Sequence, residues 1–413
     1  MPFTQNDVDA RLKTTAEKRH TGSAGRGVSR SRRLDGLELS DIRAMSRESD
    51  RHGAINLAQG ICDLPTPLPV AEATKAAVDA GLSTYSYPEG DIGLRQAIAT
   101  KLQHHNGITT DPDHEIVVTV GATGAFTATV NALLDVGDGI LLTEPFYGYH
   151  RSSAVIAGLE PQFVTLRAPG FELTEQALED AVRANTRALV ICTPANPSGR
   201  MFSRAELEAV ARVAHRHDLL VITDEIYEYI RFDGRPHISP ATVGALHDRT
   251  VTISGLSKTF SITGWRLGYV AAPAPLARAI NLVNDLYYVC APTPLQHGVT
   301  AGFGLPPSYF TALADDYQRK RDQLCGVLDR IGARPIVPEG AYYVMADVTG
   351  WGYTTSRQAA LSLVREAGVA AVPGSAFYQN DAGDGLLRFC FAKQQAVLDE
   401  ACARLEHFTP TRQ

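Results

Sequence analysis

The 413-residue sequence lacks the features that mark several classes of protein. No uninterrupted apolar run approaches the roughly 20 residues of a membrane-spanning helix. The net charge is −6, so the chain has no basic excess that would attract nucleic acid or an anionic membrane. We therefore expect neither a nucleic acid nor a membrane among its partners.

Cysteine is sparse and shows no metal-binding spacing. The six cysteines lie far apart without a CxxC pair, which is typical of reduced thiols in a cytoplasmic enzyme. The twelve histidines are not spaced with cysteines in the way that zinc ligands are. We expect no metal site and a cytoplasmic location.

Residues 1–33 differ from the rest of the chain. They hold eight Lys or Arg residues against three acids, with little apolar periodicity. The segment has no hydrophobic stretch of the kind that a signal peptide needs, and we predict a flexible basic arm. It is also too short for a helix-turn-helix module.

The rest of the chain predicts an α/β fold. With 44% hydrophobic and 20% charged residues it is long enough for two globular domains. From about residue 70 to 305, apolar runs alternate with amphipathic helices, which indicates a mostly parallel sheet between helices. The predicted strands are 115–120, 139–143, 187–192, 218–223, 250–254 and 265–271, and the predicted helices include 124–134, 174–184 and 203–217.

A smaller α+β domain is predicted to follow. Residues 306–413 open with an amphipathic pattern over 307–331 and continue with shorter elements. Residues 34–69, which end in a proline-rich crossing, are expected to pack with that domain. The large domain would then span residues 70–305.

Lys258 lies just past a predicted buried strand, where α/β folds place their ligands. An isolated lysine is most often a solvated surface charge. A lysine that enters the interior loses its proton readily, and its neutral amine forms Schiff bases with aldehydes. Nearby hydroxyls and Arg266 are groups that bind phosphate. An aldehyde and a phosphate together suggest pyridoxal phosphate.

Other candidate residues also follow predicted strands. Gly121-Ala122-Thr123 opens a helix, where backbone N–H groups can approach a phosphate, although a simple tight turn is as good an interpretation. Tyr147 could stack on a flat ring or be a core aromatic residue. Asn196 could lie in a plain β-turn or donate its amide to a phenolate oxygen.

Asp224 directly follows the predicted strand 218–223 and would arrive buried at the tip of that strand. An unpaired buried carboxylate is costly, and a protonated pyridine nitrogen is one partner that removes the cost. The same pair would serve catalysis, because a protonated ring is a better electron sink. Tyr227, three residues further on, could bind the ring hydroxyl.

From about residue 40 onward, the chain resembles the class I and II aminotransferases of pyridoxal-phosphate fold type I. The motifs occur in the family's order and at its separations. They are Tyr85-x-x-x-x-Gly90, Gly121-Ala122-Thr123, Tyr147, Asn196-Pro-x-Gly199, Asp224-x-x-Tyr227, Ser257-Lys258, Arg266 and Arg388.

The resemblance implies a role for each motif. Lys258 would bind the cofactor aldehyde as a Schiff base and then carry a proton between the substrate Cα and the cofactor. Asp224 would keep the ring nitrogen protonated. The remaining implied roles are the ring oxygen for Asn196 and Tyr227, ring stacking for Tyr147, the phosphate for Gly121, Ala122, Thr123, Ser257 and Arg266, and the substrate carboxylate for Arg388, Asn196 and Gly60.

The resemblance also implies the reaction and the assembly. The chain would exchange an amino group between an L-amino acid and a 2-oxo acid through Lys258. Tyr85 in this family reaches the phosphate of the neighbouring subunit, which implies a homodimer with shared active sites.

The sequence departs from the family pattern in places. Gly255 stands where many members carry a phosphate-binding serine, so that Ser254 substitutes for it or the contact is absent. Cys62 replaces a usual proline beside Gly60. Thr123 stands where some aspartate-specific relatives carry lysine, and residues 287–292 lack the arginine that binds a second carboxylate in others. We therefore expect a substrate that is not strictly dicarboxylic.

Two alternatives follow from the same residues. An enzyme with this cofactor could eliminate or replace a β or γ substituent, as do relatives resembling aminocyclopropane-carboxylate synthases that act on S-adenosylmethionine, because a fold does not fix the reaction outcome. A cofactor-binding transcriptional sensor is a second alternative. It would need an attached DNA-binding module, for which residues 1–33 are too short.

Overall fold

A computed structural model describes residues 30–37 and 40–410. Residues 1–37 form one unit and residues 38–413 a second, larger unit. The described part of the first unit contains one short helical turn, η1 (Arg32–Leu34), and the Ser31 side chain accepts a hydrogen bond from the backbone N–H of Arg33 at its start. Residues 1–29 of the predicted basic arm lie outside the described residues.

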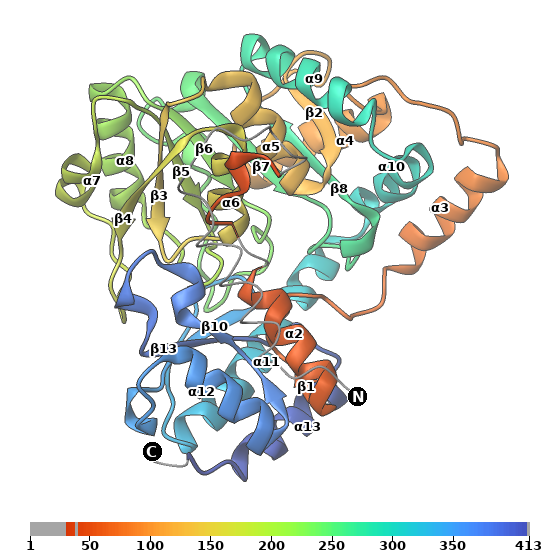
Figure 1. The fold of residues 1–413 in the computed structure, drawn as a ribbon. Coiled ribbons are helices and arrows are strands. Elements are labelled where there is room, and N and C mark those ends of the chain that lie inside the picture. Colours follow the sequence, from red (N-terminus) through yellow and green to blue (C-terminus); the bar gives the residue numbers. More distant parts are fainter. Residues whose placement is uncertain (1–29, 38–39, 411–413) are drawn as a thin grey trace, which may run out of the picture. The chain divides into compact units, whose positions relative to one another are not determined.

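A seven-stranded sheet forms the centre of the large part of the second unit (Figure 1). Its strand order is β2-β8-β7-β6-β5-β3-β4, and every neighbouring pair is parallel except the two pairs that β8 makes. The strands are β2 (Ile116–Val120), β3 (Gly139–Glu144), β4 (Glu160–Thr165), β5 (Thr186–Cys192), β6 (Leu220–Asp224), β7 (Thr250–Gly255) and β8 (Leu267–Ala271). The α/β fold class predicted from the alternating pattern is confirmed.

The central strands read as nearly continuous apolar runs because helices cover both faces of the sheet. All predicted strands are present, with ends that shift by one or two residues. The edge strand β4 was not predicted. Its sequence, Glu-Pro-Gln-Phe-Val-Thr, mixes polar and apolar residues because only alternate side chains are buried there.

Helices lie on both sides of this sheet. They are α3 (Leu68–Asp79), α4 (Ile92–Lys101), α5 (Gly121–Leu133), α6 (Gly148–Ala157), α7 (Glu175–Ala181), α8 (Arg204–Arg216), α9 (Ala274–Tyr288) and α10 (Thr293–Thr300). The start of α8 shows why the sequence is helical there: Ser203 and Glu206 form a reciprocal capping box, and the buried side of the helix is apolar. The predicted helices in this part are confirmed to within three residues at each end.

A second, antiparallel sheet lies in the C-terminal part, in the order β12-β13-β10-β9. Its strands are β9 (Arg334–Ile336), β10 (Tyr343–Asp347), β12 (Val372–Pro373) and β13 (Leu386–Cys390), with α11 (Pro307–Arg330), α12 (Ser356–Ser362) and α13 (Gln395–Glu406) around them. N-terminal residues join this part: β1 (Ile55–Asn56) pairs in parallel with β11 (Val369–Ala370), and α2 (Asp41–His52) contacts α12, β11 and β12 (Figure 1).

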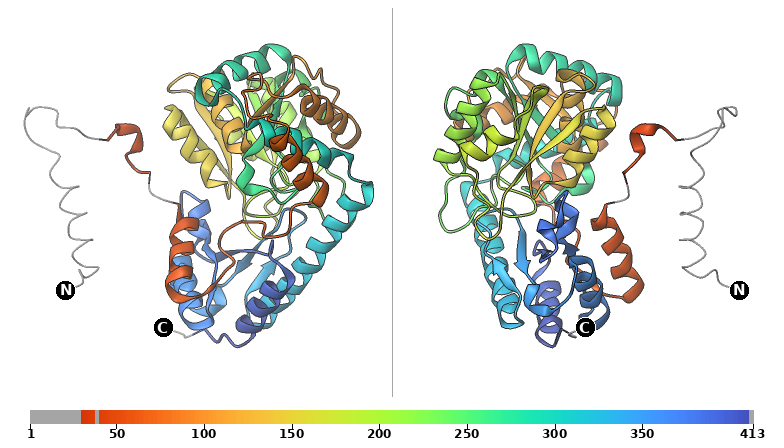
Figure 2. Two further views of the ribbon diagram at one scale, coloured as in Figure 1. Left: turned by 90° about the vertical axis from the view of Figure 1, so that its right-hand side faces the viewer. Right: turned by 60° about the vertical axis from the view of Figure 1, so that its left-hand side comes forward.

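The helix α11 belongs to both parts of the second unit (Figure 2). Near its start, the ring of Phe310 stacks on Tyr229 at 4.5 Å, close to the seven-stranded sheet. Further along, Tyr317 packs against Tyr342 and Phe391 beside the four-stranded sheet. The helix α11 therefore packs beside both sheets.

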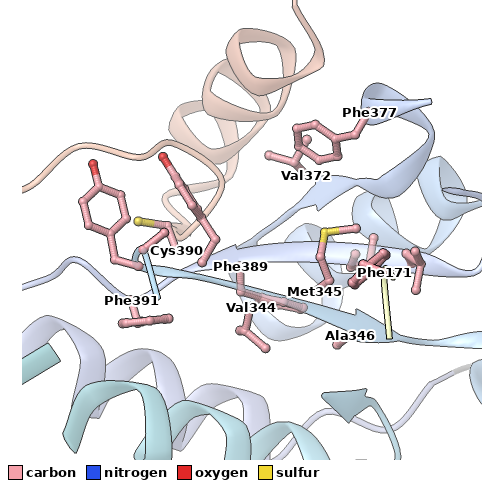
Figure 3. Packing of buried hydrophobic residues seen from close by; sticks show 14 of the residues in the cluster. Phe171, Val344, Met345, Ala346, Val372, Phe377, Phe389, Cys390 and Phe391 are labelled. Atoms are coloured by element: carbon pink, nitrogen blue, oxygen red, sulfur yellow. The ribbon is translucent and has the colours of Figure 1, made fainter. Parts of the chain in front are cut away.

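Apolar side chains pack closely on both faces of the four-stranded sheet (Figure 3). Val344, Met345 and Ala346 of β10 lie beside Phe389 and Cys390 of β13, and all are fully buried. Burying side chains of this size stabilises a fold by about 1.5–3 kcal/mol each. Within residues 30–37 and 40–410, no helix combines the length and the apolar character needed to cross a bilayer.

Candidate active site

A pocket of about 170 Å³ opens at one edge of the seven-stranded sheet. It is lined by every residue predicted for the site except Gly121 and Tyr85. The predicted residues in its wall are Gly60, Ala122, Thr123, Tyr147, Asn196, Asp224, Tyr227, Ser257, Lys258, Arg266 and Arg388. Residues more than 300 positions apart in the sequence thus meet in one small space.

The topology of the sheet explains why these residues meet. The strands β2, β3, β5, β6 and β7 run in the same direction, so the loops at their carboxyl ends gather at one edge. The strand β8 runs the opposite way, which brings the residue just before its start, Arg266, to that same edge. Ligands of α/β proteins bind at this edge of the sheet.

Asp224 is the last residue of β6 and is 5% exposed. Its Oδ2 lies 3.1 Å from Nε2 of His150, and its Oδ1 accepts a hydrogen bond from the backbone N–H of Ile226 at 3.3 Å. The His150 ring is stacked on Phe126 at 4.5 Å and meets the edge of Tyr147 at 5.1 Å. The carboxylate is therefore held in one orientation at the floor of the pocket.

Lys258 follows β7, and its side chain lines the pocket. Its Nζ lies 3.5 Å from the carbonyl oxygen of Gly60 and sits over the rings of Tyr342 and Tyr227, at 5.5 and 5.9 Å from their centroids. Burial lowers the pKa of this amine from 10.5 to about 8. A useful fraction of Lys258 is thus a neutral, nucleophilic amine near neutral pH.

The start of α5 and Arg266 form a corner of the pocket whose groups are suited to an anion. The first residues of α5, Ala122 and Thr123, line the pocket, and backbone N–H groups at a helix start attract anions. A Cβ atom on Gly121, which has φ +72°, would lie 2.7 Å from Nη2 of Arg266. Gly121 therefore does not line the pocket but makes room for the guanidinium that does.

The backbone of Arg266 is itself unusual. Its φ of +57° is a left-handed conformation that a residue with a side chain adopts at some cost. Its Nη1 donates to the carbonyl oxygen of Thr263 at 2.9 Å. The strained backbone and the local hydrogen bond aim the guanidinium at the pocket.

Arg388 of β13 is completely buried beneath the opposite wall. It donates to Oδ1 of Asn196 at 2.9 Å and to the carbonyl oxygen of Ala58 at 2.6 Å. Its Nε has no hydrogen-bond partner among the described residues, and none of their carboxylates pairs with it. A buried guanidinium without a counter-charge is costly, so the site is prepared for an anion.

The same contact orients Asn196. Because Oδ1 accepts from Arg388, the amide nitrogen Nδ2 is the end left to donate into the pocket. The opposite side of the pocket carries a second donor, Tyr227, whose Oη lies 3.1 Å from Oη of Tyr343. Burial raises the pKa of Tyr227, which keeps its hydroxyl protonated.

Several residues of the pocket wall were not predicted, and two of them, His150 and Tyr343, contact predicted site residues. Tyr147 caps the start of α6 and His150 lies in its first turn, three residues later, a spacing that puts both on one side of the helix. That spacing could have identified His150. Tyr343 lies 116 residues from its partner Tyr227, and no local pattern in the sequence links the two.

Tyr85 is 80% exposed and lies away from the pocket of its own chain. Ser254 is buried, and its hydroxyl donates to Glu228 at 2.8 Å instead of lining the pocket. Ser254 is therefore not placed to substitute for the serine that Gly255 replaces. Cys62 is also directed elsewhere, with Sγ 3.0 Å from Tyr317 Oη and 3.1 Å from Ser261 Oγ.

The chain matches one protein family over most of its length. The family is described as aminotransferase class I and II, and it matches residues 52–405. That span contains the whole pocket except Ile42, which contributes to its wall.

Individual relatives are aminotransferases from distant organisms. The probable N-succinyldiaminopimelate aminotransferase DapC of Mycobacterium tuberculosis is 36% identical, over 87% of this chain and 94% of its own. Human kynurenine–oxoglutarate transaminase 1 is 33% identical, over 89% and 95%. The crystal structure of YbdL from Escherichia coli, described with a methionine aminotransferase function, has a TM-score of 0.89 and 31% identity and covers 92% of this chain and 100% of that one.

Proposed function

The chain belongs to the class I and II aminotransferases, a family of transferases that use pyridoxal phosphate, and we propose that the pocket around Lys258 is where it transfers the amino group. Its relatives carry out amino-acid transamination, which supports that reaction for this chain and not the elimination or substitution considered as the alternative. The observation that carries the location is the small pocket that joins a low-pKa lysine, a buried carboxylate and a buried arginine that has no carboxylate partner among the described residues.

The residues present fit this cofactor. When bound, pyridoxal phosphate supplies an aldehyde that joins to amines and a protonated ring that withdraws electrons. The corner built by the start of α5, Ser257 and Arg266 offers backbone, hydroxyl and guanidinium donors for a phosphate. The glycine at position 121 supports this assignment, because any side chain there would displace the guanidinium.

The walls of the pocket offer partners for an aromatic ring that carries a protonated nitrogen and an oxygen that accepts hydrogen bonds. Asp224 would hold the proton of the ring nitrogen, and His150 fixes the direction of its carboxylate. Nδ2 of Asn196 and the hydroxyl of Tyr227 would donate to the ring oxygen. Tyr147, whose ring already packs against His150, would cover one face of the ring.

Lys258 and Arg388 would handle the substrate. The planar guanidinium of Arg388 would hold the α-carboxylate, with the orphan Nε as one of the donors and the backbone N–H of Gly60 nearby. Once its amine is free, Lys258 would carry the proton from the substrate Cα to the cofactor. Its pKa of about 8 suits a base that works near neutral pH. The carbonyl oxygen of Gly60 keeps Nζ near the centre of the pocket.

The pocket supports a substrate that is not strictly dicarboxylic. Among the residues that line it, the cations are Lys258, Arg266 and Arg388, and each has an assigned partner. None remains for a second carboxylate. The named relatives act on different side chains, those of succinyldiaminopimelate, kynurenine and methionine, so the family membership leaves the side chain open.

The proposed assembly is a homodimer with shared sites. The loop that carries Tyr85 and Tyr87 exposes both rings, at 80% and 77%, and hydrogen bonds from Thr293 and Asn284 fix it beside α9 and α10. The end of α9 exposes Leu286 at 76%. An apolar area of this kind supports a protein interface. Sedimentation velocity should give a dimer, and a monomer at micromolar concentration would contradict the proposal.

We also expect a reducing, cytoplasmic location. All six cysteines are free, and Cys62, Cys192, Cys325, Cys390 and Cys402 are buried. Thiols kept free in this way are typical of proteins from reducing compartments.

A two-stage spectroscopic experiment tests the reaction. The holoenzyme is mixed with single amino acids, without an acceptor, while its visible absorbance and the released 2-oxo acid are followed. A productive amino acid should bleach the band of the lysine-bound cofactor and release about one 2-oxo acid per site, and a 2-oxo acid should restore the band. Continuous release of ammonia without any acceptor would contradict transamination.

A further inference from the structure

Two buried phenols face each other between the two sheets. Tyr227 follows β6 and Tyr343 begins β10, and they are 4% and 3% exposed. Their hydroxyl oxygens lie 3.1 Å apart, which is a hydrogen bond in which either can donate. The bond links the loop at the floor of the pocket to the sheet that carries Arg388.

Tyr343 also touches the residue assigned to the substrate carboxylate. In the register of β10 and β13, Met345 pairs with Arg388, so Tyr343 is the diagonal neighbour of Arg388 on the same face of the sheet. Its ring centroid lies 4.3 Å from the guanidinium carbon. The ring and the hydroxyl of Tyr343 therefore have separate partners.

The protonation states decide the direction of the hydrogen bond. Burial raises the pKa of Tyr227 well above its usual value, and that of Tyr343 to about 12. Both hydroxyls keep their protons at neutral pH, but only one proton can lie between the two oxygens. If Tyr227 donates to the ring oxygen of the cofactor, its own oxygen is left as the acceptor, and Tyr343 must supply the proton.

A glycine preserves the space for the Tyr343 hydroxyl. A Cβ atom on Gly60 would lie 1.8 Å from Oη of Tyr343 and 2.8 Å from the ring carbon that bears it. Atoms cannot approach so closely, so the backbone at position 60 is compatible with this hydroxyl only in the absence of a side chain. The glycine at position 60 therefore makes room for the Tyr343 ring and its hydroxyl together.

We propose that Tyr343 is a positioning residue that donates its hydroxyl proton to Tyr227 and so directs the Tyr227 proton at the ring oxygen of the bound cofactor. The proposal rests on the proposed function, because it takes the pocket to be the cofactor site. A hydroxyl that accepts a hydrogen bond becomes a stronger donor. Tyr343 thus sets how firmly Tyr227 stabilises negative charge on the ring oxygen.

The variant Tyr343→Phe removes the hydroxyl and keeps the ring against Arg388. The measurement is a pH titration of the visible absorbance of the bound cofactor. With a weaker donor at Tyr227, charge on the ring oxygen is less stabilised, and the proton shared with the nearby nitrogen is released at higher pH. We expect the titration midpoint to rise by roughly half a pH unit, the size expected from one hydrogen bond.

Three further variants make the result specific. Tyr343→Leu should shift the midpoint and also raise the KM for the amino acid, whereas Tyr343→Phe should leave KM within about twofold, because only leucine removes the ring that packs on Arg388. In a Tyr227→Phe background, Tyr343→Phe should produce no further shift. The matched control is Tyr353→Phe, which removes a hydroxyl bonded to Ser362 outside the pocket and should titrate like the wild type.

Each outcome has one meaning. A midpoint for Tyr343→Phe equal to that of the wild type would overturn the proposal, as would a full shift that persists in the Tyr227→Phe background. If the wild-type protein itself shows no pH-dependent cofactor band, the proposed location of the cofactor site fails instead. The two failures are therefore distinguishable in the same titration.

Discussion

Replacing Lys258 by alanine is expected to lower the rate of transamination by roughly 10⁴-fold or more and to remove the visible band of the lysine-bound cofactor. Among the described residues that line the pocket, Lys258 carries the one side-chain amine, and in the proposed function it has two successive uses, as the bond to the cofactor and as the base at the substrate Cα. The aldehyde would still bind through its phosphate, so the variant should hold the cofactor noncovalently. Borohydride treatment followed by mass measurement of the protein checks the covalent link, and single-turnover kinetics checks the rate.

The exposed lysine of α3 provides the matched control for this prediction. Lys75→Ala removes the same charge outside the pocket and should keep both the band and the rate. The pKa adds a second readout in the wild-type apoenzyme: because burial lowers the pKa of Lys258 to about 8, the neutral amine increases about tenfold between pH 7 and 9, and covalent capture of the cofactor should accelerate accordingly. Full turnover by Lys258→Ala would show that the chemistry lies elsewhere.

Replacing Asp224 by asparagine should lower kcat by roughly 10²–10³-fold, a loss typical of removing one preorganised electrostatic partner. Asparagine fills nearly the same volume but carries no charge, so it would no longer hold the proton on the ring nitrogen. The measurement is the rate of the amino-acid half-reaction in the reconstituted holoenzyme. Cofactor affinity is measured in parallel, so that a binding defect is not mistaken for a chemical one.

His150→Asn gives the graded comparison for this second prediction. It leaves the carboxylate charged and removes the group that orients it, so we expect a smaller loss, of about tenfold, from the single close contact of 3.1 Å between Nε2 and Oδ2. The sharper test is whether Asp224→Asn lowers kcat more than His150→Asn does. If Asp224→Asn retained more than a tenth of the wild-type kcat, the carboxylate would not be the partner of the ring nitrogen.

Most of the pocket follows from the sequence because parallel strands impose the geometry. Once β5, β6 and β7 are recognised as buried parallel strands, the residues that follow them must gather at one edge, whatever their separation in the chain. Lys258 and Asp224 could be placed in this way without any knowledge of side-chain contacts. The ends of the strands were predicted only to within one or two residues, and β6, for example, includes Asp224 itself.

The residues that were missed depend on contacts that no local pattern encodes. Tyr343 reaches the pocket only through the pairing of β10 with β13 and the way that sheet meets the loop after β6. Neither can be read from alternation or periodicity, which describe one element at a time. The direction of β8 could not be predicted from the sequence either, because an antiparallel strand and a parallel one have similar sequences when both faces are buried.

The contact between Gly60 and Tyr343 also limits the order in which the sequence can change. With the Tyr343 hydroxyl present, any side chain at position 60 meets an oxygen at 1.8 Å, so the glycine cannot be replaced first. Tyr343→Phe removes this contact but leaves the ring carbon at 2.8 Å, so position 60 becomes tolerant only after the ring itself is replaced by a smaller side chain. In a population of variants, we therefore expect position 343 to change before position 60 and not after it.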